Sequence, residues 1–62
     1  MGAKLEAYFE RVKESGGTTA QMKLAMLTRL SPKKAREAED SGQNIALFES
    51  AIAKLKEQGV IT

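Results

Sequence analysis

The sequence predicts an all-α fold, a small compact bundle of three main helices plus one short helix. Apolar residues recur at the 3.6-residue period of a helix in three stretches, and no segment has the pattern of a strand. The connections between the expected helices are at most four residues long, which is typical of helices packed against their neighbours. The chain of 62 residues is therefore predicted to form a single domain.

The first helix is predicted over residues 3–14. Leu5, Tyr8, Phe9 and Val12 are spaced at i, i+3, i+4 and i+7, so they form one apolar stripe, while charged residues fill the other face. The glycines at positions 16 and 17 follow, and glycine readily takes the left-handed conformation that ends a helix.

The second helix is predicted over residues 19–30, with a threonine at 18 or 19 as its N-cap. Ala20, Leu24 and Leu27 centre one face, and other apolar residues continue round the helix from it. Because most of its circumference is apolar, we expect this helix to be central and packed on more than one side.

A short helix is predicted over residues 32–40. Ser31 and Pro32 are typical of an N-cap and a first helical position. The only apolar side chains that follow are Ala35 and Ala38, which suit close approach to another helix but cannot drive docking by themselves.

The last helix is predicted over residues 42–58, capped by Ser41, and its apolar seam comprises Ile45, Phe48, Ile52 and Leu55. Gly59 stands where a helix-terminating glycine is expected, and Val60 can fold back on Leu55. The final two residues are expected to trail off.

The predicted core consists of the large apolar residues on these faces: Leu5, Tyr8, Phe9, Val12, Leu24, Met26, Leu27, Leu30, Ile45, Phe48, Ile52, Leu55 and Val60. This core is small for a chain that has no disulfide. A homodimer that covers Met22 or Leu47 would add buried area. Alternatively, the chain belongs to a longer protein.

The composition argues against an enzyme. The chain has no His and no Cys, so it lacks the commonest general base and the thiolate ligands of zinc and iron–sulfur sites. Glu6, Glu10 and Glu14 share one helix face, but we interpret them as a solvated stripe, because a calcium ion needs six or more oxygens around it. We therefore expect no catalytic residues, no metal and no cofactor.

No apolar run is longer than that of residues 24–27, which is far short of the ~20 residues that a spanning helix needs. The N-terminus lacks the apolar stretch of a secretory signal. These features predict a cytoplasmic protein with no membrane partner.

Charge is distributed unevenly along the chain. Residues 15–36 carry a net charge of +5 with no acidic residue, whereas residues 37–62 carry −3. A basic segment can meet phosphates or an acidic protein surface. The alternative is that the basic and acidic parts of the chain face each other or keep the protein soluble.

Residues 21–40 resemble the helix-turn-helix of DNA-binding proteins. Ala25 matches the small residue of the first helix, and Ala35 and Ala38 match the inward positions of the second. The resemblance implies that Lys33, Lys34 and Arg36 lie at the N-terminal end of a recognition helix. The chain departs from the motif at Arg29, where glycine is usual. It departs again in the acidic residues at positions 37, 39 and 40, which would repel phosphates.

A protein-interaction module is the competing interpretation, and it is the one that we favour. Its candidate partner-binding residues are Met22, Ala25, Met26, Lys33, Lys34 and Arg36. The first three remain after one face of the second helix is buried, although the methionines could also fill the core. The basic residues could steer an acidic partner. The sequence thus predicts a small adaptor or regulatory domain that binds another protein or itself, with nucleic-acid binding through residues 23–36 as the alternative.

Overall fold

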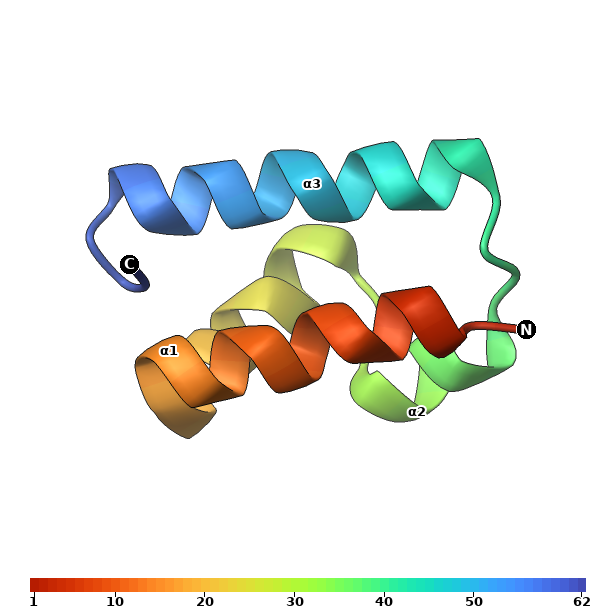
Figure 1. Cartoon of the computed structure of the whole chain (residues 1–62), viewed down its shortest axis with the longest axis horizontal. Coiled ribbons are helices and arrows are strands. Elements are labelled where there is room, and N and C mark those ends of the chain that lie inside the picture. Colours follow the sequence, from red (N-terminus) through yellow and green to blue (C-terminus); the bar gives the residue numbers. More distant parts are fainter.

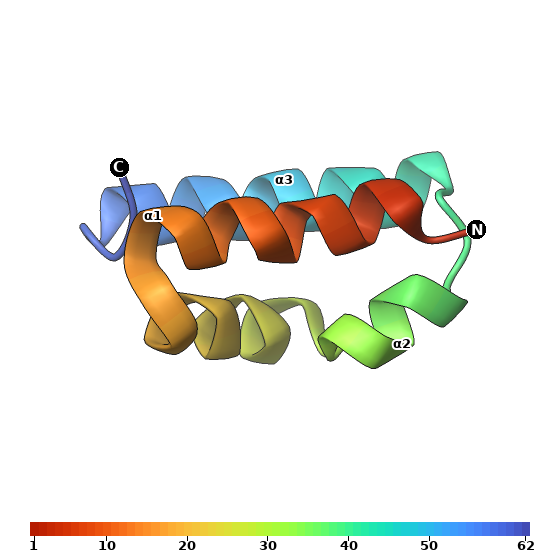
Figure 2. The ribbon, with the colours of Figure 1, turned by 60° about the horizontal axis from the view of Figure 1, so that its bottom comes forward.

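The computed structural model describes all 62 residues as three helices, α1 (Ala3–Thr28), α2 (Pro32–Glu37) and α3 (Gly42–Glu57) (Figure 1). The predicted all-α fold is confirmed. Helix α1 turns back on itself, so that its first arm (residues 3–16) and α3 run side by side in the same direction (Figures 1 and 2). The second arm (residues 18–28) returns along the bundle, and α2 continues beyond it. No helix is both long and apolar enough to cross a membrane.

The two helices predicted at residues 3–14 and 19–30 are arms of the single helix α1, and Gly17 is its only non-helical residue. Gly17 has φ 76° and ψ −167°, a backbone region that is essentially restricted to glycine. One residue is thus enough to redirect the chain. The helix continues on both sides of the break, and the predicted threonine cap is wrong, because neither Thr18 nor Thr19 accepts a capping hydrogen bond.

The second arm ends at Thr28, two residues earlier than predicted. Its buried hydroxyl donates a hydrogen bond to the carbonyl oxygen of Leu24, 2.8 Å away, and accepts one from the N–H of Leu30. Arg29 then adopts the left-handed conformation, with φ 60° and ψ 24°. That conformation stops the helix, because it cannot continue a right-handed one.

Helix α2 begins as predicted, where the hydroxyl of Ser31 accepts a hydrogen bond from the N–H of Lys34. It ends at Glu37, so the predicted end at residue 40 is wrong. Ala38 is extended, and Asp40 leaves the helix to accept hydrogen bonds from backbone N–H groups in the first turn of α1. This tertiary contact requires the chain to turn away from α2.

Helix α3 ends at Glu57, one residue before the predicted end, and Ser41 caps its N-terminus as predicted. At the other end, Gly59 has φ 76° and Val60 donates a hydrogen bond to the carbonyl oxygen of Leu55. This is a Schellman motif, which confirms the expected fold-back. The expectation that the last residues trail off is wrong, because Ile61 is buried among the core residues.

The core lies between α3 and the two arms of α1, with α2 covering one end (Figure 2). Phe48 is its centre: its ring stacks on Tyr8 at 5.7 Å between centroids and meets the edge of Phe9 at 5.5 Å. Most predicted core residues are buried or half-buried, but Met26 is 77% exposed and is not part of the core. Besides Ile61, the remaining core positions are alanines: Ala20, Ala35 and Ala51.

Candidate docking surface

The apolar residues predicted to bind a partner lie on two sides of the second arm. Met22 is 62% exposed and Met26 is 77% exposed, and they are one helical turn apart on the same face. Ala25 is half-buried and packs against the core. The second arm is therefore less enclosed than the sequence predicts, because α3 covers only part of its apolar circumference.

A shallow groove runs beside Met26, between the second arm and α3. It consists of two depressions of about 220 and 120 Å³ that share Leu27. The first is lined by Lys23, Met26, Leu27, Leu55 and Gln58. The second is lined by Leu27, Leu47, Ser50, Ala51 and Lys54. We call these two depressions together the Leu27 groove.

The Leu27 groove follows a single face of α3. Its α3 residues lie three, four, seven and eight positions after Leu47, and the C-cap Gln58 lies eleven after it, which is the spacing of one helical stripe. At 1.5 Å per residue, the stripe from Leu47 to Gln58 is about 16 Å long. Ala51 lies within this stripe and is buried. Leu47 is 41% exposed at one end.

The charges along the Leu27 groove are all positive. Lys23 belongs to the second arm and Lys54 to α3, so each wall contributes one lysine. No carboxylate lines either depression. Neither lysine forms an ion pair, since the one ion pair of the structure joins two other residues.

The predicted basic residues lie elsewhere, on α2, and none of them lines the Leu27 groove. Lys33, Lys34 and Arg36 are all exposed. Arg36 makes the ion pair with Glu6 of α1, donating from its Nε to a carboxylate oxygen. This hydrogen bond, together with the charge of Glu6, raises the pKa of Arg36. The apolar and the basic residues predicted to bind a partner therefore lie on different parts of the surface, and Arg36 is already paired with an acidic residue.

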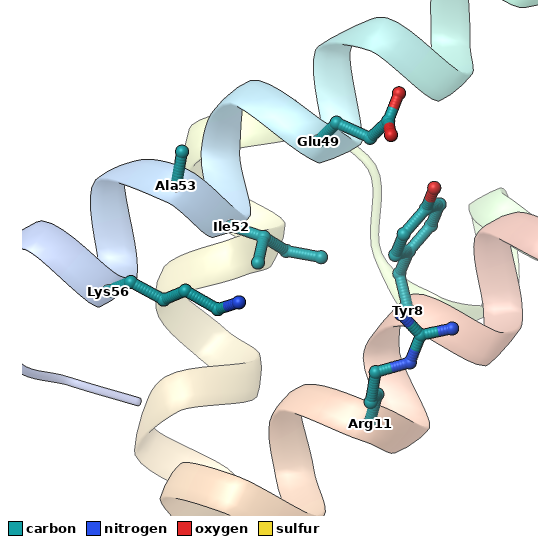
Figure 3. A pocket seen from close by; sticks show the side chains of 6 residues that line it. All are labelled: Tyr8, Arg11, Glu49, Ile52, Ala53 and Lys56. Atoms are coloured by element: carbon teal, nitrogen blue, oxygen red, sulfur yellow. The ribbon is translucent and has the colours of Figure 1, made fainter. Parts of the chain in front are cut away.

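A second cleft, of about 290 Å³, lies between the first arm and the opposite side of α3 (Figure 3). The guanidinium of Arg11 lies over the ring of Tyr8, 5.5 Å from its centroid. Lys56 and Glu49 extend from α3 on either side of Ile52. Residues of both charges line this cleft, together with Ile52 and the ring of Tyr8. The lining therefore favours neither an anionic nor a cationic ligand.

Sequence reasoning found Met26 but missed the groove beside it. The sequence predicts Leu27 as a core residue, and it indicates Leu47 as a residue that a homodimer would cover, without placing the two side by side. Lys23 stood out only as part of the basic segment, and Lys54 was not predicted to pair with it, because the two residues are 31 positions apart and only the fold brings them to one groove.

No group of three or more His, Cys, Asp or Glu side chains lies close enough together to hold a metal ion. Comparisons of this chain with protein-family models, with curated proteins and with solved structures found no match.

Proposed function

We propose that this chain is a non-enzymatic protein-interaction module that binds a helix of its partner in the Leu27 groove. The observation that carries the proposal is the pair of exposed apolar side chains, Met26 and Leu47, at a groove whose other apolar lining residues are Leu27, Leu55 and Ala51. Exposed apolar surface beside a concave site is typical of surfaces that bind other proteins.

The shape of the groove favours a helix as the bound element. A partner helix that presents apolar residues at i, i+4 and i+7 reaches across about 10 Å, which fits within a stripe of about 16 Å. Met26 supports the same interpretation, since the flexible thioether side chain adapts to different partner surfaces. Met22, one turn earlier on the same face, would extend the contact.

An amide-shift titration tests the proposal with an uncharged amphipathic helical peptide that carries a leucine seam and glutamine flanks. We expect shifts at the groove residues and loss of binding in Met26→Asp. Ala46→Asp is the matched control, because Ala46 is an exposed residue of α3 that lines neither depression. Both variants should keep the helicity of the parent chain. Absence of shifts, or unchanged binding by Met26→Asp, would contradict the proposal.

Nucleic-acid binding is the second candidate, and the turn after the second arm favours it. Arg29 takes the left-handed conformation at the position where helix-turn-helix proteins usually carry glycine, and Ala35 is fully buried at an inward position. Lys33 and Lys34 stand exposed at the start of α2. The length of α2 favours the first candidate instead, because six residues extend only about 9 Å.

A generic DNA duplex separates the two candidates. Under the nucleic-acid hypothesis, shifts appear between residues 28 and 36 at low salt and vanish near 0.2 M salt. The triple variant Lys33→Ala, Lys34→Ala, Arg36→Ala should then lose binding without losing helicity, since all three side chains are exposed. Under the protein-interaction proposal, the duplex leaves the groove residues unchanged.

A further inference from the structure

We infer that the occupant of the Leu27 groove is an acidic amphipathic helix of another protein, with carboxylates on both flanks of its apolar seam. This inference rests on the proposed function and names the chemistry of the partner. Its basis is charge complementarity: each wall of the groove contributes a lysine, and no carboxylate lines the groove to neutralise either one.

The two lysines are placed to contact both sides of a bound helix. Lys23 lines the depression near Leu55 and Gln58, and it belongs to the second arm. Lys54 lines the depression near Leu47, and it belongs to α3. A helix lying along the groove therefore meets one lysine on each flank. A partner with acidic residues on one flank alone would satisfy only one of them.

Both lysines are available for such a partner. Both are exposed, and neither takes part in the ion pair of the structure, which joins Arg36 and Glu6. Each lysine borders the apolar surface of the groove, so the two positive charges would favour an acidic partner and oppose a basic one. The leucine contacts would provide the buried apolar area.

A second copy of this chain fits the groove poorly. Besides Met1, the exposed large apolar residues are Met22, Met26 and Leu47, which are on or next to the groove itself. Pairing two grooves face to face would therefore bring lysines toward lysines. The acidic face of the first arm has Glu6, Glu10 and Glu14, but its only apolar residues are Ala3 and Ala7, and Arg11 lies beside them. No helix of the chain combines an exposed seam of large apolar residues with acidic flanks.

Three peptides with the same leucine seam and with glutamate, glutamine or lysine flanks test the inference against the labelled full chain. We expect the glutamate peptide to bind most tightly and the lysine peptide least, with a difference on the order of tenfold that shrinks as salt rises. The double variant Lys23→Glu, Lys54→Glu should reverse this order. Lys33→Glu, Lys34→Glu is the matched control, since it makes the same charge change on α2, away from the groove.

The results distinguish the acidic character of the partner from the binding of a helix in the groove. Equal binding of all three peptides at the groove residues would overturn the inference and leave the proposed function intact. Binding of no peptide would overturn both. Sedimentation equilibrium adds an independent measurement: a monomer across the concentration range is expected, whereas a dimer that Met26→Asp dissociates would make a second copy the occupant and overturn the inference.

Discussion

The carboxylate of Asp40 lies 3.4 Å from the backbone nitrogen of Leu5, across a sequence separation of 35 residues. Its other oxygen lies 3.4 Å from the backbone nitrogen of Lys4. Gly2, the residue at the N-cap position of α1, has no side chain that could accept these hydrogen bonds. The loop between α2 and α3 therefore provides the cap of the first helix, and the acidic side chain also opposes the positive end of the helix dipole.

Replacing this distant cap should destabilise the protein. We expect Asp40→Ala to lower the free energy of unfolding by about 1 kcal/mol, the usual cost of removing a helix cap. Glu39→Ala is the matched control, because the neighbouring Glu39 side chain is exposed and makes no hydrogen bond. Urea unfolding followed by circular dichroism measures both. Equal midpoints for the two variants would show that Asp40 does not act as a cap.

The break in α1 should depend on glycine at position 17. A Cβ at Gly17 would meet no atom within 4 Å, so only its backbone conformation opposes a side chain. We expect Gly17→Ala to cost about 1–3 kcal/mol through strain. Gly42→Ala provides the contrast: Gly42 also has open space but lies in α3 without positive φ, and there alanine should stabilise by about 0.4–1 kcal/mol. Thermal melts that shifted in the same direction for both variants would argue against strain at Gly17.

Replacing Arg29 with glycine should have the opposite effect on stability from replacing Gly17 with alanine. It is the one residue other than glycine with positive φ, a conformation that costs an L-residue about 1 kcal/mol. We therefore expect Arg29→Gly to raise stability by up to about 1 kcal/mol, less the greater flexibility of glycine in the unfolded chain. Arg29→Ala should bring no such gain, since alanine keeps the strain. Chemical denaturation of the two variants side by side distinguishes relief of strain from loss of charge.

Phe48 should be the least replaceable side chain. It is fully buried and touches the rings of Tyr8 and Phe9. We expect Phe48→Ala to cost about 3–5 kcal/mol, which is enough to unfold a domain of this size. Leu47→Ala, next to it in the sequence but 41% exposed, should melt close to the parent chain. A cooperative melt of Phe48→Ala near that of the parent would remove Phe48 from the centre of the core.

Periodicity predicted most of the fold because the large apolar residues of the first arm and α3 follow one helical face each. Periodicity predicted the wrong structure where a contact between distant segments outweighs the helical preference of the local sequence. The helix predicted to reach residue 40 stops early because Asp40 caps α1, and no local pattern reports that contact. Ile61 is buried for a related reason: Thr62 donates a hydrogen bond to the hydroxyl of Ser15, 3.0 Å away, and holds the end of the chain against the bundle.

The candidate surface was less predictable than the fold. An excess of apolar residues on the second arm indicated that some would stay exposed, but helical spacing alone does not say which. Within that arm Leu24 is fully buried, whereas Met26, two residues later, is 77% exposed. The groove itself depends on how α3 lies against that arm, which is a property of packing and not of either segment alone.

Amide-shift mapping with two ligands tests the proposed function most directly: the glutamate-flanked peptide is added to one labelled sample and a DNA duplex to another. The proposed function predicts peptide shifts at Lys23, Leu27 and Lys54 that persist near 0.2 M salt, because apolar contacts provide most of the binding. It predicts no specific shifts with DNA. Shifts confined to residues 28–36 on adding the duplex, with none at the groove on adding the peptide, would contradict it and assign the binding to the basic segment.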